Sequence, residues 1–342
     1  MNRFAWTNPR TVSEAAAAAT TIVADAMLFG PAGPGAVTIL KAGGIDLLDL
    51  MKETLLMPAM LVNLQQIPGL GSIAPGDGGV LRIGPMVTLA ALATHPLIRQ
   101  RYPALADAAS RSASPQIRNV ATLGGNLLQR PRCWYFRAKE HHCLRKGGDH
   151  CFAIPGENQY HAIFDNSPCA IVHPSTAATV LVALNATVEL TDAKGTVRRL
   201  LLVDFFGPPD QDILRENNLK PQEILTSVLL PALPASMRMA HLKQGEKDSL
   251  DWPLADVAVL LDLASDKMCK GATVILGAAS PVPYRAKAAE AALIGKHIDD
   301  GVARQAGRAA LNGATPLSQN AYKLPLFETL VRRTILAAAA IG

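Results

Sequence analysis

Several signatures of catalysis are missing from this chain of 342 residues. It contains no G-x-S-x-G nucleophile elbow, no H-E-x-x-H metalloprotease motif and no kinase signature. The dinucleotide motif G-x-G-x-x-G and the phosphate loop G-x-x-x-x-G-K-[ST] do not occur, and the carboxylates are scattered without pairing. We therefore expect that this chain performs no acid–base chemistry on a substrate, and that any reaction it supports belongs to a bound cofactor.

Signals for export, membranes and nucleic acids are absent as well. The N-terminus "MNRFAWTNPR" lacks an apolar core followed by a cleavage site, so we expect no signal peptide. The apolar tail "TILAAAAIG" is too short to cross a bilayer, so we expect no membrane span. The net charge is +5, but no run of Lys and Arg is interleaved with aromatics, so we expect no nucleic-acid partner. A modestly basic surface suits an acidic partner subunit or an anionic cofactor.

What is present is the composition of a large globular chain. Apolar residues make up 49% and charged residues 18%, and the length predicts two or three domains. Apolar periodicity and β-branched runs predict helices and strands in mixed order, so we expect an α+β / α/β fold. The predicted elements are a capped helix over 11–27, a strand–glycine turn–helix–strand unit over 33–64, a helix over 175–186, a strand pair over 186–202, a meander over 257–280, and three helices near 285–294, 299–312 and 318–340.

Two glycine pairs stand where an apolar segment meets a turn, in "KAGG" (41–44) and "TLGGN" (122–126). Glycine lets the backbone approach a ligand without a Cβ, and successive peptide N–H groups in such a turn form an anion-binding concavity. A helix is predicted directly after the first pair, and its N-terminal end adds positive potential. Two such loops, if they converge, would suit a diphosphate, although a single Gly-Gly pair is more often an ordinary turn.

The stretches "ILKAGGIDLLDLM" and "QIRNVATLGGNLL" resemble the FAD-binding subunit of the molybdenum hydroxylase family, which includes xanthine dehydrogenase, carbon monoxide dehydrogenase and bacterial aldehyde oxidoreductases. "CAIVHPSTAATVLVALNATVEL", "EILTSVLLP" and "HLKQGEKDSLDWPLADVAVLL" follow in the family's order, so the resemblance covers nearly the whole chain. It implies a two-lobed FAD-binding domain of the PCMH type over 1–232, with lobe one about 1–64 and lobe two about 65–232. A C-terminal flavoprotein domain over 233–342 would combine an antiparallel sheet with helices.

In that family the two glycine loops clasp the FAD diphosphate. By resemblance, the first loop is Lys41, Ala42, Gly43, Gly44, Ile45 and Asp46, and the second loop is Thr122, Leu123, Gly124, Gly125 and Asn126. Lys243 in "HLKQ" matches a basic residue near the flavin. The family usually has P-S-D where this chain has "PSTAA", so Thr176 offers a hydroxyl without charge, and Ser175 and Thr176 also suit a helix cap.

Four of the five cysteines lie in one polar, arginine-rich region, at Cys133, Cys143, Cys151 and Cys169. Four thiolates can hold an Fe–S cluster or a structural zinc ion. The spacing contains neither a tight C-x₂₋₄-C pair nor a common ferredoxin pattern, so spacing alone does not select iron or zinc. Basic residues nearby could offset the thiolate charge, namely Arg130, Arg132, Arg137, Arg145 and Lys146. Cys269 is expected to be a lone thiol.

This region resembles an insertion, about 129–170 here, which carries a [4Fe–4S] cluster in the FAD subunit of one subgroup of the family. Its sequence is more similar to the periplasmic aldehyde oxidoreductases than to the 4-hydroxybenzoyl-CoA reductases, which also carry such an insertion. The resemblance implies FAD and a [4Fe–4S] cluster in this chain, and partners in the form of a large molybdopterin-binding subunit and a small [2Fe–2S] subunit.

The implied function is electron transfer in a heterotrimeric aldehyde oxidoreductase, from the partner subunits to an external acceptor. The alternatives are the FAD subunit of a 4-hydroxybenzoyl-CoA reductase-like enzyme, a free-standing FAD oxidase, and a non-redox scaffold with a zinc-stapled loop. We expect a periplasmic location, reached by export of the folded complex on a partner's twin-arginine signal, with the cytoplasm as the alternative.

Overall fold

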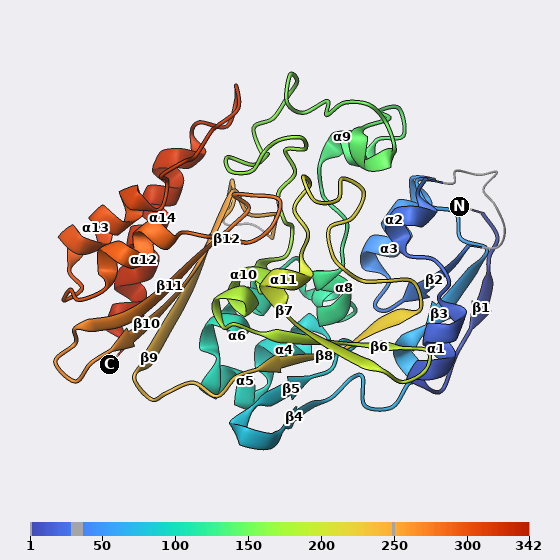
Figure 1. The fold of residues 1–342 in the computed structure, drawn as a ribbon, viewed down its shortest axis with the longest axis horizontal. Helices are drawn as coiled ribbons and strands as arrows, with labels where there is room; N and C mark the ends of the chain where they lie inside the picture. Colours follow the sequence, from blue (N-terminus) through green and yellow to red (C-terminus); the bar gives the residue numbers. More distant parts are fainter. Residues whose placement is uncertain (1, 29–36, 248–249, 342) are drawn as a thin grey trace.

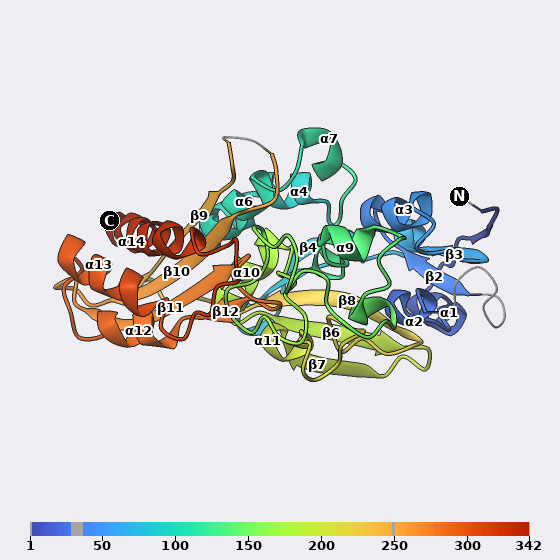
Figure 2. The ribbon, with the colours of Figure 1, turned by 90° about the horizontal axis from the view of Figure 1, so that it is seen from above.

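The computed structural model describes residues 2–28, 37–247 and 250–341, which form three sheets with helices packed around them (Figure 1). Seen from above, the three sheets follow one another along the long axis of the molecule (Figure 2). The mixed fold predicted from the sequence is confirmed. In the part of the chain that the structure describes, no helix has the combination of length and apolar character that crossing a membrane requires.

The N-terminal lobe is built on a small parallel sheet. Its strands are β1 (Ala5–Thr7), β3 (Met60–Asn63) and β2 (Thr38–Lys41), in the order β1-β3-β2, and its helices are α1 (Val12–Ala18), α2 (Val23–Ala26) and α3 (Ile45–Lys52). β2, a glycine turn, α3 and β3 form the predicted crossover unit. Its residues 33–36 lie outside the described residues.

The single helix predicted over 11–27 is wrong, although its N-terminus is correct. Thr11 and Glu14 form the predicted capping box at the start of α1. The helix ends after Ala18, because Ala19 leaves the helical region and two β-branched threonines, which form helices poorly, follow it. A second short helix, α2, then begins at Val23.

The middle lobe contains a five-stranded antiparallel sheet. Its strands are β4 (Ile73–Pro75), β5 (Leu81–Ile83), β8 (Glu223–Leu230), β6 (Thr187–Asp192) and β7 (Val197–Leu201), in the order β4-β5-β8-β6-β7. The helices that accompany it are α4 (Leu89–Thr94), α5 (Pro96–Arg101), α6 (Pro103–Ser110), α7 (Pro115–Arg118), α8 (Leu123–Leu127), α10 (Thr176–Ala183) and α11 (Leu202–Phe205). Short 3₁₀ turns occur at Leu64–Gln66 and Asp77–Gly79.

The C-terminal part is the predicted meander covered by three helices. Strands β9 (Met237–Gln244), β10 (Ala255–Leu263), β11 (Cys269–Gly277) and β12 (Tyr284–Arg285) form an antiparallel sheet in the order β12-β11-β10-β9. Helices α12 (Lys287–Leu293), α13 (Asp300–Ala309) and α14 (Lys323–Ala340) follow. α14 contacts β10 and β9, while the fully buried α10 of the middle lobe contacts β10 and β11. These contacts explain why β10 is buried along most of its length.

The predicted insertion of about residues 129–170 is mostly irregular, with only α9 (Trp134–Arg137) and a 3₁₀ turn at Leu144–Lys146. It runs along one edge of the molecule, from α9 beside the N-terminal lobe toward the C-terminal helices (Figure 1). At one end, Phe136 and Cys143 join the buried core formed by α3. At the other, buried Lys323 of α14 donates to the carbonyl oxygens of His161 (3.1 Å) and Ala278 (2.7 Å). The insertion is therefore tied to both ends of the fold.

Candidate functional site

The two glycine loops meet in one cleft of about 440 Å³. Of the fourteen cofactor-binding residues predicted from the resemblance, those that line the cleft are Ala42, Gly43, Gly44, Ile45, Asp46, Thr122, Gly124, Gly125, Asn126, Thr176 and Lys243. They come from the N-terminal lobe, the middle lobe and the C-terminal sheet. The predicted convergence of the two loops is therefore present in the structure.

The first loop needs its glycines because it approaches another backbone and begins a helix. A Cβ on Gly43 would lie 2.3 Å from the carbonyl oxygen of Val120, just before the second loop. Gly44 has a φ of 89° and precedes the first residue of α3. No side chain caps α3, so its first N–H groups have no side-chain acceptor among the described residues. These N–H groups and the positive end of α3 favour an anionic group in this part of the cleft.

The second loop is a different structure from the open turn that the sequence suggested. Thr122 caps the short helix α8, so the glycine pair lies inside its first turn. The Gly124 N–H donates to the Pro85 oxygen (2.8 Å), and the Gly125 N–H donates to Thr122 Oγ1 (3.2 Å). A Cβ on Gly124 would lie 2.7 Å from Pro85. The second loop therefore contributes close packing, whereas its glycine N–H groups already have acceptors within the protein.

Three predicted residues do not line the cleft. The Lys41 ammonium lies 5.4 Å from the centre of the Trp6 ring, and Leu123 is fully buried in the core of the middle lobe. Ser175 is the N-cap of α10, as its alternative interpretation predicted, and its hydroxyl also donates to Asn126 Oδ1 (2.5 Å). Ser175 thus fixes the orientation of Asn126, which does line the cleft.

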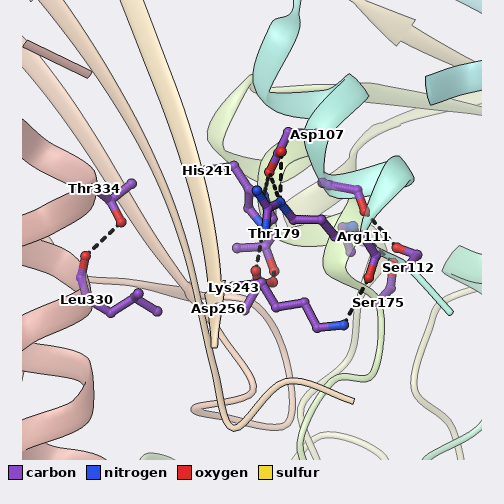
Figure 3. Close-up of polar contacts among 12 residues, drawn as sticks. Asp107, Arg111, Ser112, Ser175, Thr179, His241, Lys243, Asp256, Leu330 and Thr334 are labelled. Atoms are coloured by element: carbon purple, nitrogen blue, oxygen red, sulfur yellow. Dashed lines mark hydrogen bonds and ion pairs between the residues drawn. The ribbon is translucent and has the colours of Figure 1, made fainter. Parts of the chain in front are cut away.

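Lys243 lies two residues after a histidine that belongs to a buried network between β9, β10 and α6 (Figure 3). His241, two residues earlier on β9, contacts Asp107 Oδ2 through Nδ1 (2.8 Å) and Asp256 Oδ1 through Nε2 (2.6 Å). Despite burial, these two carboxylates raise the pKa of His241 to about 9. Lys243 Nζ donates to the carbonyl oxygens of Arg111 (3.0 Å) and Asp251. Burial lowers the pKa of Lys243.

The four clustered cysteines line a second, smaller pocket together with Tyr135, Phe136, Arg145 and His161. His161 Nε2 lies 3.2 Å from Cys133 Sγ. Burial raises the pKa of Cys133 to about 12, and a hydrogen bond from the Cys169 thiol lowers the pKa of Cys151 to about 5. Among the described residues, no three His, Cys, Asp or Glu side chains are arranged to hold a single metal ion. Cys269 is buried elsewhere, and its thiol donates to the Gly271 oxygen.

Four of the five basic residues around the cysteines form two pairs with different partners, and the fifth, Arg130, lies beside Glu216. Arg132 and Arg137 pair with Asp46 of α3, at 2.8 and 2.7 Å, rather than with the thiols. Arg145 and Lys146 do lie near them. Against the effect of burial, Glu216 and then Cys169 raise the pKa of Arg145, whereas burial lowers the pKa of Lys146 despite the charges of Cys143 and Cys133. The expectation that all five cations offset thiolate charge is therefore wrong for Arg132 and Arg137.

Sequence reasoning missed several cleft residues. Glu216 comes from an irregular segment and Trp252 from the β9–β10 connection, and Arg130 was assigned to the cysteines alone. The Arg132 guanidinium lies 4.6 Å from the centre of the Trp252 ring, across the cleft mouth. No motif marks Glu216 or Trp252, because their position depends on chain segments that come together only in the fold.

The contact at Gly43 predicts a mutational effect. Gly43→Ala is expected to force the two loops apart, because its Cβ would overlap the Val120 oxygen, and to reduce FAD content at least tenfold. Gly71→Ala is the matched control, since nothing lies within 4 Å of its Cβ. The measurement is flavin absorbance per chain after purification. Equal flavin content in the two variants would contradict the cleft geometry.

The His241 network predicts a dependence of stability on pH. Because the folded pKa lies near 9, above the ordinary 6.5, its contribution is fully present below about pH 6.5 and is lost as the pH rises through 9. The free energy of unfolding should be higher for wild type than for His241→Gln at low pH. This difference should shrink by about 3 kcal/mol at most across the interval. Denaturant titrations at pH 6 and 9.5 measure it. Exposed His297→Gln should show no such trend.

Comparisons with known proteins agree with this geometry. Residues 2–233 match the family model of the FAD binding domain in molybdopterin dehydrogenase, and residues 240–338 match the CO dehydrogenase flavoprotein C-terminal domain. The chain is 34% identical to the aldehyde oxidoreductase FAD-binding subunit PaoB of Escherichia coli, over 93% of this chain and 94% of that protein. It is 26% identical to the carbon monoxide dehydrogenase medium chain of Hydrogenophaga pseudoflava, over 99% and 98%.

Solved structures show the same fold. The chain aligns with reconstituted CO dehydrogenase from Oligotropha carboxidovorans with a TM-score of 0.74 and 22% identity, covering 100% of this chain and 99% of that chain. It aligns with quinoline 2-oxidoreductase from Pseudomonas putida 86 with a TM-score of 0.73 and 24% identity, covering 99% and 97%. With its two-loop cleft and its matches along both halves, this chain belongs to the FAD-binding subunits of the molybdenum hydroxylase family.

Proposed function

We propose that this chain is the FAD- and [4Fe–4S]-carrying electron-transfer subunit of a heterotrimeric, molybdenum-dependent aldehyde oxidoreductase. It would pass electrons from a large molybdopterin subunit and a small [2Fe–2S] subunit to an external acceptor. The observation that carries the proposal is the gathering of four thiols in one pocket beside the FAD cleft. The 34% identity to an aldehyde oxidoreductase FAD-binding subunit supports the substrate class.

The cleft fits FAD in its shape and its chemistry. The glycines at the lobe contact leave no room for a Cβ, and the uncapped start of α3 favours a negative group. Buried Arg130 adds a cation to the same cleft. When bound, FAD supplies the ability to take up two electrons one at a time and hand them to an acceptor, so the residues of this chain need only bind and orient it.

The thiols supply the ligand set that a [4Fe–4S] cluster requires. In such a cluster each of four thiolates binds a different iron. Cys133, Cys143, Cys151 and Cys169 line one shared pocket. Phe136 and Ile171, both buried, line the same pocket and would limit the access of water to a cluster.

The comparisons do not favour the other functions considered from the sequence. The relatives reported above are oxidoreductase subunits, which gives no support to a non-redox scaffold with a zinc-stapled loop. None of them is named as a 4-hydroxybenzoyl-CoA reductase. A free-standing oxidase would need a base at the flavin ring, and no sequence motif supplies one.

The cysteine pocket gives a direct test. The purified chain should contain iron and sulfide, and dithionite reduction should produce an Fe–S signal in electron paramagnetic resonance. Cys143→Ser should abolish this signal because it removes one of four ligands. Cys269→Ser is the matched control, because this thiol is also buried but lies outside the pocket. Zinc without iron in wild type, or an unchanged iron content in Cys143→Ser, would contradict the proposal.

We also propose that the complex works in the periplasm, carried there in the folded state by a partner's twin-arginine signal. The resemblance of the insertion to the periplasmic aldehyde oxidoreductases supports this location. A chain that receives FAD and a cluster before export would require a route for folded proteins.

Fractionation of cells that express the whole complex tests this location. The chain should be found in the periplasmic fraction, and replacing the partner's arginine pair by lysines should move it to the cytoplasmic fraction. A cytoplasmic chain in cells with the unaltered partner would refute the periplasmic assignment without affecting the cofactor assignments.

A further inference from the structure

Arg130 has a buried guanidinium with unused hydrogen-bond donors. The residue is only 3% exposed and lines the cleft, four residues after Asn126 of the second loop. Its backbone N–H donates to Asp46 Oδ2 (2.8 Å), which ties it to the start of α3. Its side-chain atoms Nε, Nη1 and Nη2 have no hydrogen-bond partner among the described residues. Buried arginine donors are almost always paired, so these three call for an acceptor.

The carboxylate next to Arg130 does not satisfy it, because that carboxylate is shared. Glu216 Oε2 lies 3.2 Å from Arg130 Nε, without the geometry of a hydrogen bond, while Glu216 Oε1 accepts from Arg145 Nη1 at 2.7 Å. Arg145 is 1% exposed, and it also interacts with Cys169 in the thiol pocket. Two buried arginines thus share one glutamate, which leaves one positive charge uncompensated within this group of three side chains.

The acceptor that the proposed function brings to the cleft is the diphosphate of FAD. The other candidates for phosphate contact at the second loop are already used, since the Gly124 and Gly125 N–H groups donate to Pro85 and Thr122. A negative group between the loops would therefore find N–H donors at the start of α3 and the cationic fork of Arg130, which is tied to the same helix through Asp46. Arginine is the residue whose planar fork best matches phosphate oxygens.

We propose that Arg130 binds the diphosphate of FAD, with Glu216, which Arg130 shares with Arg145, beside its guanidinium. The assignment rests on the FAD part of the proposed function and not on the cluster. The Arg130 guanidinium carbon also lies 4.9 Å from the centre of the Phe136 ring, which restricts the movement of the side chain.

The test compares ligands with and without phosphate on the flavin-free full chain. Affinities for FAD, ADP and riboflavin are measured by fluorescence and calorimetry for wild type and Arg130→Gln. The variant should bind FAD and ADP about 10- to 100-fold more weakly, the value of a charge-assisted hydrogen bond, and riboflavin equally well. Because Glu216 keeps its bond to Arg145, the substitution leaves no unpaired carboxylate.

Two further variants keep the result interpretable. Arg130→Lys retains the charge but loses the fork, so it should recover only part of the FAD affinity. Arg304→Gln removes an exposed arginine of α13 outside the cleft and should behave as wild type. Equal FAD affinity in wild type and Arg130→Gln, or an equal loss for riboflavin, would overturn the Arg130 assignment alone. A wild-type chain that binds no FAD would overturn both this assignment and the flavin role.

Discussion

The structure depends on one contact between two stretches of backbone. Gly43 in the first loop lies so close to the Val120 carbonyl that no side chain fits between them. This approach joins the N-terminal lobe to the middle lobe and leaves a cleft that both lobes line. A backbone-to-backbone contact of this kind is insensitive to the identity of surrounding side chains, but it requires glycine at one position. The cleft is thus a property of the joint between the lobes.

A second set of contacts positions the C-terminal sheet, which lines the cleft through Lys243. α10 is buried on all sides between the middle lobe and the C-terminal sheet, and Thr179 of this helix donates to Asp256 Oδ2 at 2.7 Å. Asp256 also contacts Nε2 of His241, and Nδ1 of the same imidazole contacts Asp107 of α6. The charged group around His241 therefore joins β9, the strand that carries Lys243, to β10 and α6. The strength of these contacts depends on the protonation of the His241 imidazole.

Local patterns in the sequence predicted the local structure well. Apolar spacing and β-branched runs identified the crossover unit of the first lobe, the meander and the three final helices, because these elements bury one regular face. The predicted helix over 11–27 failed where the weak helix formers Thr20 and Thr21 interrupt the alanine run. The resemblance located both glycine loops, but it did not show that the second pair lies within a capped helix whose N–H groups are used.

Contacts between distant segments were not predictable in the same way. Asp46 and Glu216 form ion pairs with arginines from the cysteine region, and the spacing of these residues in the sequence indicates neither ion pair. Lys41 and Leu123 belong to the loop motifs by sequence, yet one lies against Trp6 and the other in the core. The gathering of the four thiols was expected from the family resemblance alone, since their spacing left iron and zinc open.

The attachment of the insertion to Lys323 bears on the order of biosynthesis. The thiol pocket includes His161, whose carbonyl is held by Lys323 of α14, a helix that leaves the ribosome long after the last of the four cysteines. The Asn320 side chain, beside that helix, donates to the same carbonyl and to that of Ala162. The pocket therefore reaches its final form only after α14 has been translated.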